Sequence, residues 1–185
     1  IIQDRELSEV EMVEIAESFF LSLGFDPLPD TFWERSLFTK PKDRDVVCHA
    51  SAWDIDSQEQ DLRIKMCIEK NEEDFITIHH ELGHIFYYQA YADLPEIFQS
   101  GANDGFHEAV GDLLSLSITP SYLKDIGFIS EQEAEKSKEN AIRLLMKQAL
   151  AGVVAVPWTL MLDKWRMGIF NGSLSEDELN DYWWE

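Results

Sequence analysis

The part of the sequence richest in chemically active side chains is the five-residue run His80-Glu81-Leu82-Gly83-His84. On a helix, two imidazoles four residues apart project from one face, about one turn from each other, and can bind a single ion. Imidazole and carboxylate are usual ligands of zinc, and a catalytic zinc site takes three protein ligands and one water. We therefore predict that His80 and His84 are zinc ligands and that Glu81, at the edge of the same face, is the general base.

A third ligand is expected from a separate helix. Metzincin-type sites continue with Gly at position 87 and His at position 90, but this sequence has Tyr87 and Ala90, which excludes that class. The run His107-Glu108-Ala109-Val110-Gly111-Asp112 supplies a carboxylate at Glu108. Asp112, one turn later, is available to hold a ligand imidazole by its free N–H. Glu108 is therefore the predicted third ligand, and Asp112 is predicted to hold one of the ligand imidazoles in place.

These groups predict peptide hydrolysis by an activated water. A bound zinc would lower the pKa of its water toward about 7 and polarise a carbonyl group, while Glu81 would take the proton and then protonate the leaving amine. His79 and His107 are out of phase with the proposed ligands. We expect His79 to support the site or to pack within its helix, and we assign no role to His107.

Helices are expected to position most of these residues. An Asn71 cap followed by acidic residues predicts a zinc helix over about 71–91, and the third-ligand helix is predicted over about 104–118. A loop is expected at 26–30, before the first strand. Hydrophobic spacing, capping boxes and proline predict further helices at Ser8 to Leu23, Ser130 to Leu150, from an opening or kink at Pro157 to Phe170, and from Ser175 onward.

The only β-structure expected is one hairpin, with strands at Val46 to Ile55 and Leu62 to Ile68. Alternation along the first strand places one set of side chains on each face, with Ala50 and Ala52 on the face opposite His49. Small alanines let another backbone come close, so an extended peptide could add to this strand through main-chain hydrogen bonds. The facing groove wall would be the helical stripe Glu73, Thr77, His80, His84 and Tyr88, although Glu73 and Thr77 fit ordinary helix packing equally well.

Composition excludes several classes of protein. A chain of 185 residues fits one domain or a piece of a larger one. Its net charge of −21 argues against binding nucleic acid or an anionic membrane surface. The longest charge-free stretch, Gln148 to Leu162, is shorter than the roughly 20 apolar residues of a membrane span, so no membrane contact is expected. The first residues lack a signal-peptide pattern, which is therefore absent or lies outside this sequence.

Two features bear on the cellular compartment. Cys48 and Cys67 flank the predicted hairpin, where facing positions can form a disulfide, although free buried cysteines are an equally ordinary reading. A disulfide would imply an oxidising compartment. Asn171-Gly172-Ser173 matches the pattern for N-glycosylation, which is weak additional support for a secreted protein.

Several separate segments together resemble the angiotensin-converting enzyme family, the peptidyl-dipeptidases A. The resemblance implies a mostly helical, gluzincin-like fold with a deep cleft, and removal of carboxy-terminal dipeptides from oligopeptides outside the cell, with zinc as cofactor and chloride as activator. It also implies a Cys48–Cys67 disulfide, peptide contacts at His49, Ala50 and Ala52, and catalysis by Glu81. The segments are Cys48-His49-Ala50-Ser51-Ala52-Trp53-Asp54, Arg63-Ile64-Lys65, His79-His80-Glu81-Leu82-Gly83-His84, Gly105-Phe106-His107-Glu108-Ala109 and Gly111-Asp112.

The sequence departs from the family pattern at a few positions. Leu82 stands where Met is usual, Phe86 where Gln is usual and Asp104 where Pro is usual, and the hairpin loop is one residue longer. The resemblance covers the middle portion of the family's domain, so residues 1–185 are expected to form a single partial domain with half a cleft and little activity alone. A single-residue carboxypeptidase of the same family and a catalytically silent binding or receptor homologue are the rival functions.

Overall fold

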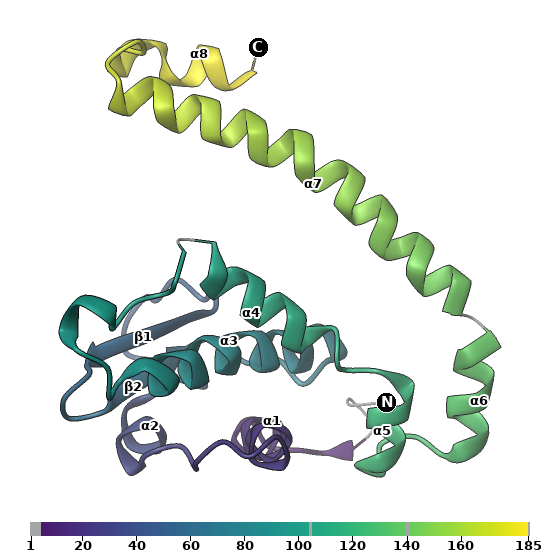
Figure 1. The fold of residues 1–185 in the computed structure, drawn as a ribbon. Helices are drawn as coiled ribbons and strands as arrows, with labels where there is room; N and C mark the ends of the chain where they lie inside the picture. The colour runs from purple at the N-terminus through teal and green to yellow at the C-terminus, as the bar shows by residue number, and fades with distance from the viewer. Residues whose placement is uncertain (1–4, 104, 140, 185) are drawn as a thin grey trace. The chain divides into compact units, whose positions relative to one another are not determined.

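The computed structural model describes residues 5–103, 105–139 and 141–184, and its ribbon is mainly helical (Figure 1). Within these ranges the only sheet is one antiparallel pair of strands, so the predicted mainly α fold with one short hairpin is confirmed. The chain divides into two compact units, Ile1–Glu131 and Gln132–Glu185. The assignment of all 185 residues to one partial domain stays a prediction.

Helix α1 (Glu9–Ser22) begins at a capping box. The Ser8 hydroxyl accepts the backbone N–H of Glu11, and the Glu11 carboxylate accepts the backbone N–H of Ser8. The helix ends before Gly24, whose φ of 95° is a conformation that favours glycine. The predicted helix is therefore confirmed, and its buried face consists of Met12, Val13, Ala16 and Phe20.

The hairpin is shorter than predicted. Strand β1 (Ser51–Asp56) pairs with β2 (Asp61–Lys65), with Ala52 opposite Ile64. Beyond Lys65 the chain leaves β1, because the N–H groups of Met66 and Ile68 donate to the carbonyls of Leu37 and Phe38 instead. Backbone pairing with this third segment ends the ladder early, so the predicted strands Val46 to Ile55 and Leu62 to Ile68 are wrong at their outer ends.

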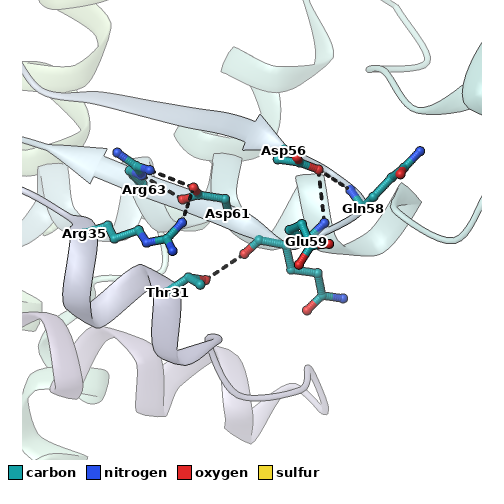
Figure 2. Close-up of polar contacts among 8 residues, drawn as sticks. Thr31, Arg35, Asp56, Gln58, Glu59, Asp61 and Arg63 are labelled. Atoms are coloured by element: carbon teal, nitrogen blue, oxygen red, sulfur yellow. Dashed lines mark hydrogen bonds and ion pairs between the residues drawn. The ribbon is translucent and has the colours of Figure 1, made fainter.

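The turn end of the hairpin is fastened to α2 (Asp30–Arg35), a helix that the sequence did not predict (Figure 2). The Asp61 side chain is almost fully buried and accepts hydrogen bonds from Arg35 at 2.5 Å and from Arg63 at 2.7 Å. The Thr31 hydroxyl donates to the carbonyl of Gln60 at 2.8 Å. Arg63 and the Arg35 guanidinium hold the pKa of Asp61 down to about 2.

Asp61→Asn is expected to lower the stability of the fold at neutral pH, and this difference should shrink in acid. The folded pKa of about 2 lies below the unfolded value of about 3.9, so the ionised carboxylate stabilises the fold above pH 4. That contribution is lost as the pH falls from about 4 toward 2. Urea midpoints of both proteins at pH 7, 5, 4 and 3 measure it.

A matched control is Asp43→Asn, because within the described residues Asp43 pairs with its exposed neighbour Arg44 alone. Surface pairs of this kind contribute little. Its stability should follow the unmodified protein at every pH. A constant stability gap for Asp61→Asn from pH 7 to pH 3 would contradict the role given to the ionised carboxylate.

Helix α3 (Glu72–Tyr91) is the predicted zinc helix and crosses the centre of its unit (Figure 1). The Asn71 side chain accepts the backbone N–H of Asp74 at 2.8 Å and caps the helix, as expected. One face is fully buried in the core, and its Phe86 ring stacks on Phe20 of α1 with centroids 4.2 Å apart. Leu82 and Phe86, two departures from the family pattern, are therefore core residues. The buried core residues of α3 are Phe75, Ile78, Leu82, Ile85 and Phe86.

Helix α4 (Phe106–Ser115) packs alongside α3 and is shorter than the predicted range of about 104–118. Helix α4 ends early because a second helix, which the sequence did not predict, starts shortly after it. This helix is α5 (Pro120–Asp125), and the Thr119 hydroxyl caps its first turn. Residue Asp104 lies outside the described residues. Between α3 and α4 the chain forms one 3-10 turn, η2 (Glu96–Phe98).

The second unit consists of α6 (Glu131–Glu139), α7 (Ala141–Phe170), η3 (Glu176–Glu178) and α8 (Leu179–Trp184). Helices α6 and α7 share the predicted range Ser130 to Leu150, and residue 140, between them, lies outside the described residues. Pro157 does not open a helix, because α7 continues through it, and the predicted kink stays a prediction. A proline removes one backbone hydrogen bond, which a long helix can tolerate. The last helix begins at the predicted Ser175 capping box.

The apolar part of α7 has the length of a membrane-crossing helix. Leu145–Phe170 covers 26 residues with a mean hydropathy of 1.4 in its most apolar window. It is much longer than the charge-free stretch counted in the sequence, because it includes charged side chains near both ends, among them Lys147 and Arg166. Length and composition alone are weak evidence for a span, so the predicted absence of membrane contact stays a prediction.

Candidate metal centre

Helix α3 presents two imidazoles on the face opposite its core contacts. His80 and His84 follow one another after one turn, and their Nε2 atoms lie 3.1 Å apart with the rings nearly perpendicular. Burial lowers the pKa of His84, and the neighbouring His80 lowers it further. A neutral imidazole with a free nitrogen is the form that binds a metal ion.

Helix α4 brings a carboxylate to the same point. One oxygen of Glu108 lies 3.4 Å from Nε2 of His80, and the other lies 3.8 Å from Nε2 of His84. One donor atom from each of these residues falls within 4.8 Å of the others. The three residues predicted as ligands are therefore adjacent in space, whereas a distant Glu108 would have removed the basis of the prediction.

Asp112 lies on the far side of the His80 ring. Its carboxylate is 3.2 Å from Nδ1 of His80, while Nε2 of the same ring faces Glu108. If Nδ1–H donates to Asp112, the tautomer that leaves Nε2 free for a metal is favoured. Asp112 is therefore next to His80, and its supporting role stays a prediction.

Two glycines let α3 and α4 approach closely. A Cβ atom on Gly111 would lie 2.8 Å from Cε1 of His80, and one on Gly83 would lie 3.0 Å from Cα of Gly111. Atoms of real side chains do not come this close, so no other residue fits at position 111 without moving the imidazole. This contact, which the sequence prediction missed, seats the His80 ring between Glu108 and Asp112.

Glu81 is buried beside the imidazoles, with 6% of its surface exposed, and its Oε2 atom has no hydrogen-bond partner. Burial raises the pKa of this carboxyl, His80 opposes the effect and Glu108 reinforces it. A buried polar atom without a partner is costly in a folded protein and calls for an explanation. Glu81 lines two hollows, of about 600 Å³ and about 340 Å³.

The strand segment before and within β1 forms the opposite wall. His49, Ala50 and Ala52 all line the smaller hollow, which they share with the His80 and His84 rings. Ala50 and Ala52 are also packed against the hydrophobic core, which explains their small size. The expected helical stripe is present too: Glu73 and Thr77 line the larger hollow, and Tyr88 lines the smaller one.

A disulfide joins Cys48 and Cys67, with Cα atoms 5.1 Å apart. Of the two possibilities left open by the sequence, the structure therefore has the disulfide and not two free cysteines. Both cysteines border the larger hollow. The bond fixes the segment that carries His49 and Ala50 to the end of β2. Asn171 is exposed directly after α7, and its glycosylation stays a prediction.

The remaining two histidines of these helices take different places. His79 is fully buried, bonded through Nδ1 to the carbonyl of Phe75 and through Nε2 to the Tyr122 hydroxyl. Burial lowers the pKa of His79 to about 4, which fits the predicted packing role. His107 contacts the tyrosines at the end of α3, and Nε2 of its ring lies 3.0 Å from the Tyr91 hydroxyl.

Comparison with known proteins gives matches along nearly the whole chain. The family model described as angiotensin-converting enzyme matches residues 1–185. The angiotensin-converting enzyme of Oryctolagus cuniculus is 46% identical over 175 residues, which cover 94% of this chain and 13% of that protein. That of Bos taurus is 45% identical over 177 residues, with 95% and 13% covered. That of Theromyzon tessulatum is 42% identical over 181 residues, with 97% and 29% covered. The chain thus spans 13% to 29% of the length of these relatives.

Proposed function

The chain belongs to the angiotensin-converting enzyme family, and from this premise we propose that it forms the zinc-binding, water-activating part of a peptidase. The observation that carries the proposal is the meeting of His80, His84 and Glu108 at one point, next to a buried Glu81. Neither the family match nor the relatives' names specify these residues, so their roles rest on the geometry.

The donor set fits zinc. Two imidazoles and one carboxylate are the ligands of one common type of catalytic zinc site, and such a site leaves a fourth position open to water. Asp112 supports the fit because its carboxylate lies 3.2 Å from Nδ1 of His80, the ring nitrogen that faces away from Glu108. Zinc bound there would make the coordinated water acidic and would polarise a substrate carbonyl.

The chain's own residues would then handle the proton. Glu81 is placed to accept a proton from the attacking water, because its side chain lines both hollows beside the His80 imidazole. Burial raises the pKa of Glu81, which helps the carboxyl to hold that proton and to deliver it to the leaving amine. Glu81 therefore serves first as general base and then as general acid.

The proposed substrate is an extended oligopeptide lying between β1 and α3. Ala50 and Ala52 offer backbone groups without bulky side chains beside the centre, and His49 lines the same hollow. By family likeness we propose the release of carboxy-terminal dipeptides and activation by chloride. Analysis of the products from the full-length protein tests this, and release of single residues would point to a carboxypeptidase instead.

The proposed compartment is extracellular. The Cys48–Cys67 disulfide fits an oxidising environment, and the family likeness points the same way. Trapping of free thiols in protein isolated from its native source tests this. A reduced pair would argue against secretion.

Zinc binding to the 185-residue chain is the direct test of the site. We expect one zinc ion per chain, measured by competition with a coloured chelator, and a large loss of affinity in His80→Ala and Glu108→Gln. Glu96→Gln, an exposed carboxylate between the two helices, should bind zinc as the unmodified chain does. We also expect little or no dipeptide release from this chain, as proposed for the central portion of a larger catalytic domain. Equal zinc affinity in all four proteins would refute the metal centre, and efficient turnover by the chain alone would refute the partial domain.

A further inference from the structure

The aromatic cluster around His107 lies directly beside the third proposed ligand. The His107 ring packs against Tyr87 and Tyr88 with centroids 4.7 Å and 4.8 Å away, and Nε2 lies 3.0 Å from the Tyr91 hydroxyl. The same ring lies 5.5 Å from that of His84. Three tyrosines at the end of α3 thus enclose the residue that immediately precedes Glu108 on α4.

The first turn of α4 has few other attachments. Its N-cap Gly105 offers no side chain to cap the helix, and the only fully buried residue of α4 is Gly111, more than a turn later. The Glu108 side chain is 72% exposed, and within the described residues its ion-pair contacts are those with the two imidazoles. An exposed carboxylate on a loosely held turn would lose much freedom on binding an ion.

His107 provides the missing attachment. Its ring is inserted among side chains of α3, and its hydrogen bond to Tyr91 joins the two helices one residue before the ligand. Tyr91 is itself only 6% exposed, so the partner is fixed in place. Gly101 also lies against the ring, since a Cβ there would be 3.1 Å from Cδ2 of His107. The imidazole is therefore held from α3 and from the loop before α4.

We propose that His107 is a positioning residue that, through its hydrogen bond to Tyr91, holds the Glu108 carboxylate toward the His80 and His84 imidazoles. The proposal rests on the zinc centre described above and extends it. His107 is not one of the proposed ligands, because the donor atoms that converge within the described residues are those of His80, His84 and Glu108. It acts before the ion arrives, by limiting the positions that Glu108 can occupy.

The test measures zinc affinity in the 185-residue chain by chelator competition, together with urea stability without metal. Tyr91→Phe removes one hydroxyl and keeps the ring, His107→Ala removes the ring, and His107→Gln can restore a hydrogen bond to Tyr91. We expect His107→Ala to weaken zinc binding about tenfold to a hundredfold, as loss of a supporting partner typically does. Tyr91→Phe should lose less, and His107→Gln should recover part of the affinity.

The matched control is Tyr122→Phe, which removes the hydroxyl bonded to His79, the residue immediately before His80. His79 is held within α3 by its own bond to Phe75, so this change should lower stability without changing zinc affinity. If Tyr91→Phe and Tyr122→Phe both lower stability and both keep full affinity, His107 is merely structural and the proposal fails. If even the unmodified chain binds zinc no better than His80→Ala, the metal centre itself fails, which is a separate result.

Discussion

Glu81→Gln in the full-length protein is expected to lower the turnover number about 10²- to 10⁴-fold, the usual contribution of general acid–base catalysis. Glutamine has nearly the shape of glutamate, but its amide cannot take a proton from water. KM should change little, because the peptide contacts proposed for Ala50 and Ala52 are untouched. Steady-state kinetics of peptide cleavage measure both parameters.

Measuring the zinc content of Glu81→Gln shows whether its lower turnover number comes from loss of the general base or from loss of the metal. Glu81 is not a proposed ligand, so Glu81→Gln should retain one zinc per site. Glu72→Gln makes the same change of charge on the same helix, at an exposed position in its first turn, and should keep normal turnover. Unchanged hydrolysis by Glu81→Gln would remove Glu81 from the mechanism.

The second large effect is expected from Gly111→Ala. Its added Cβ would meet Cε1, Nδ1 and Cγ of His80 at 2.8 to 3.0 Å, so the imidazole or the whole of α4 must move. Either movement separates His80 from Glu108 or from Asp112. We expect at least the tenfold to hundredfold loss of zinc affinity that follows loss of a supporting contact, about 1.4 to 2.7 kcal/mol. Chelator competition on the purified chain measures it.

Gly152→Ala is the control for the glycine itself. Gly152 also lies within a helix, but nothing comes within 4 Å of the Cβ that alanine would add. Alanine there should stabilise the helix by about 0.5 to 1 kcal/mol and leave zinc affinity unchanged. Normal affinity in Gly111→Ala would show that the centre tolerates a looser helix crossing than the one described.

The proposed ligands could be found in the sequence because their constraints are local. His80 and His84 share one helical face by spacing alone, and their motif restricts the choice of a third ligand to a few types of site. Glu108 then followed from the presence of a suitable helix with Asp112 one turn later. The caps Asn71 and Ser175 were found for the same reason, since each acts within one turn of its helix.

Contacts between distant segments could not be found in this way. The short strands result from competition by Leu37 and Phe38 for the N–H groups after β2, and nothing near β2 in the sequence indicates that competitor. The approach of Gly111 to His80 depends on how two helices cross, and the pairing of His107 with Tyr91 depends on the same crossing. Pro157 does not open a helix as one reading of the sequence had it, because proline is also found inside helices and the residues around it do not separate the two positions.

The proximity of Glu108 to the two imidazoles also bears on folding. An ion held by α3 and α4 would tie together two neighbouring helices that residues 92–105 separate in the sequence, much as a crosslink does, and it would have no comparable site in the unfolded chain. Metal at a hundred times its dissociation constant would then add about 2.7 kcal/mol to the stability of this unit. Supply of the ion would thus govern the fraction of chains that is folded, in addition to the chemistry proposed for the site.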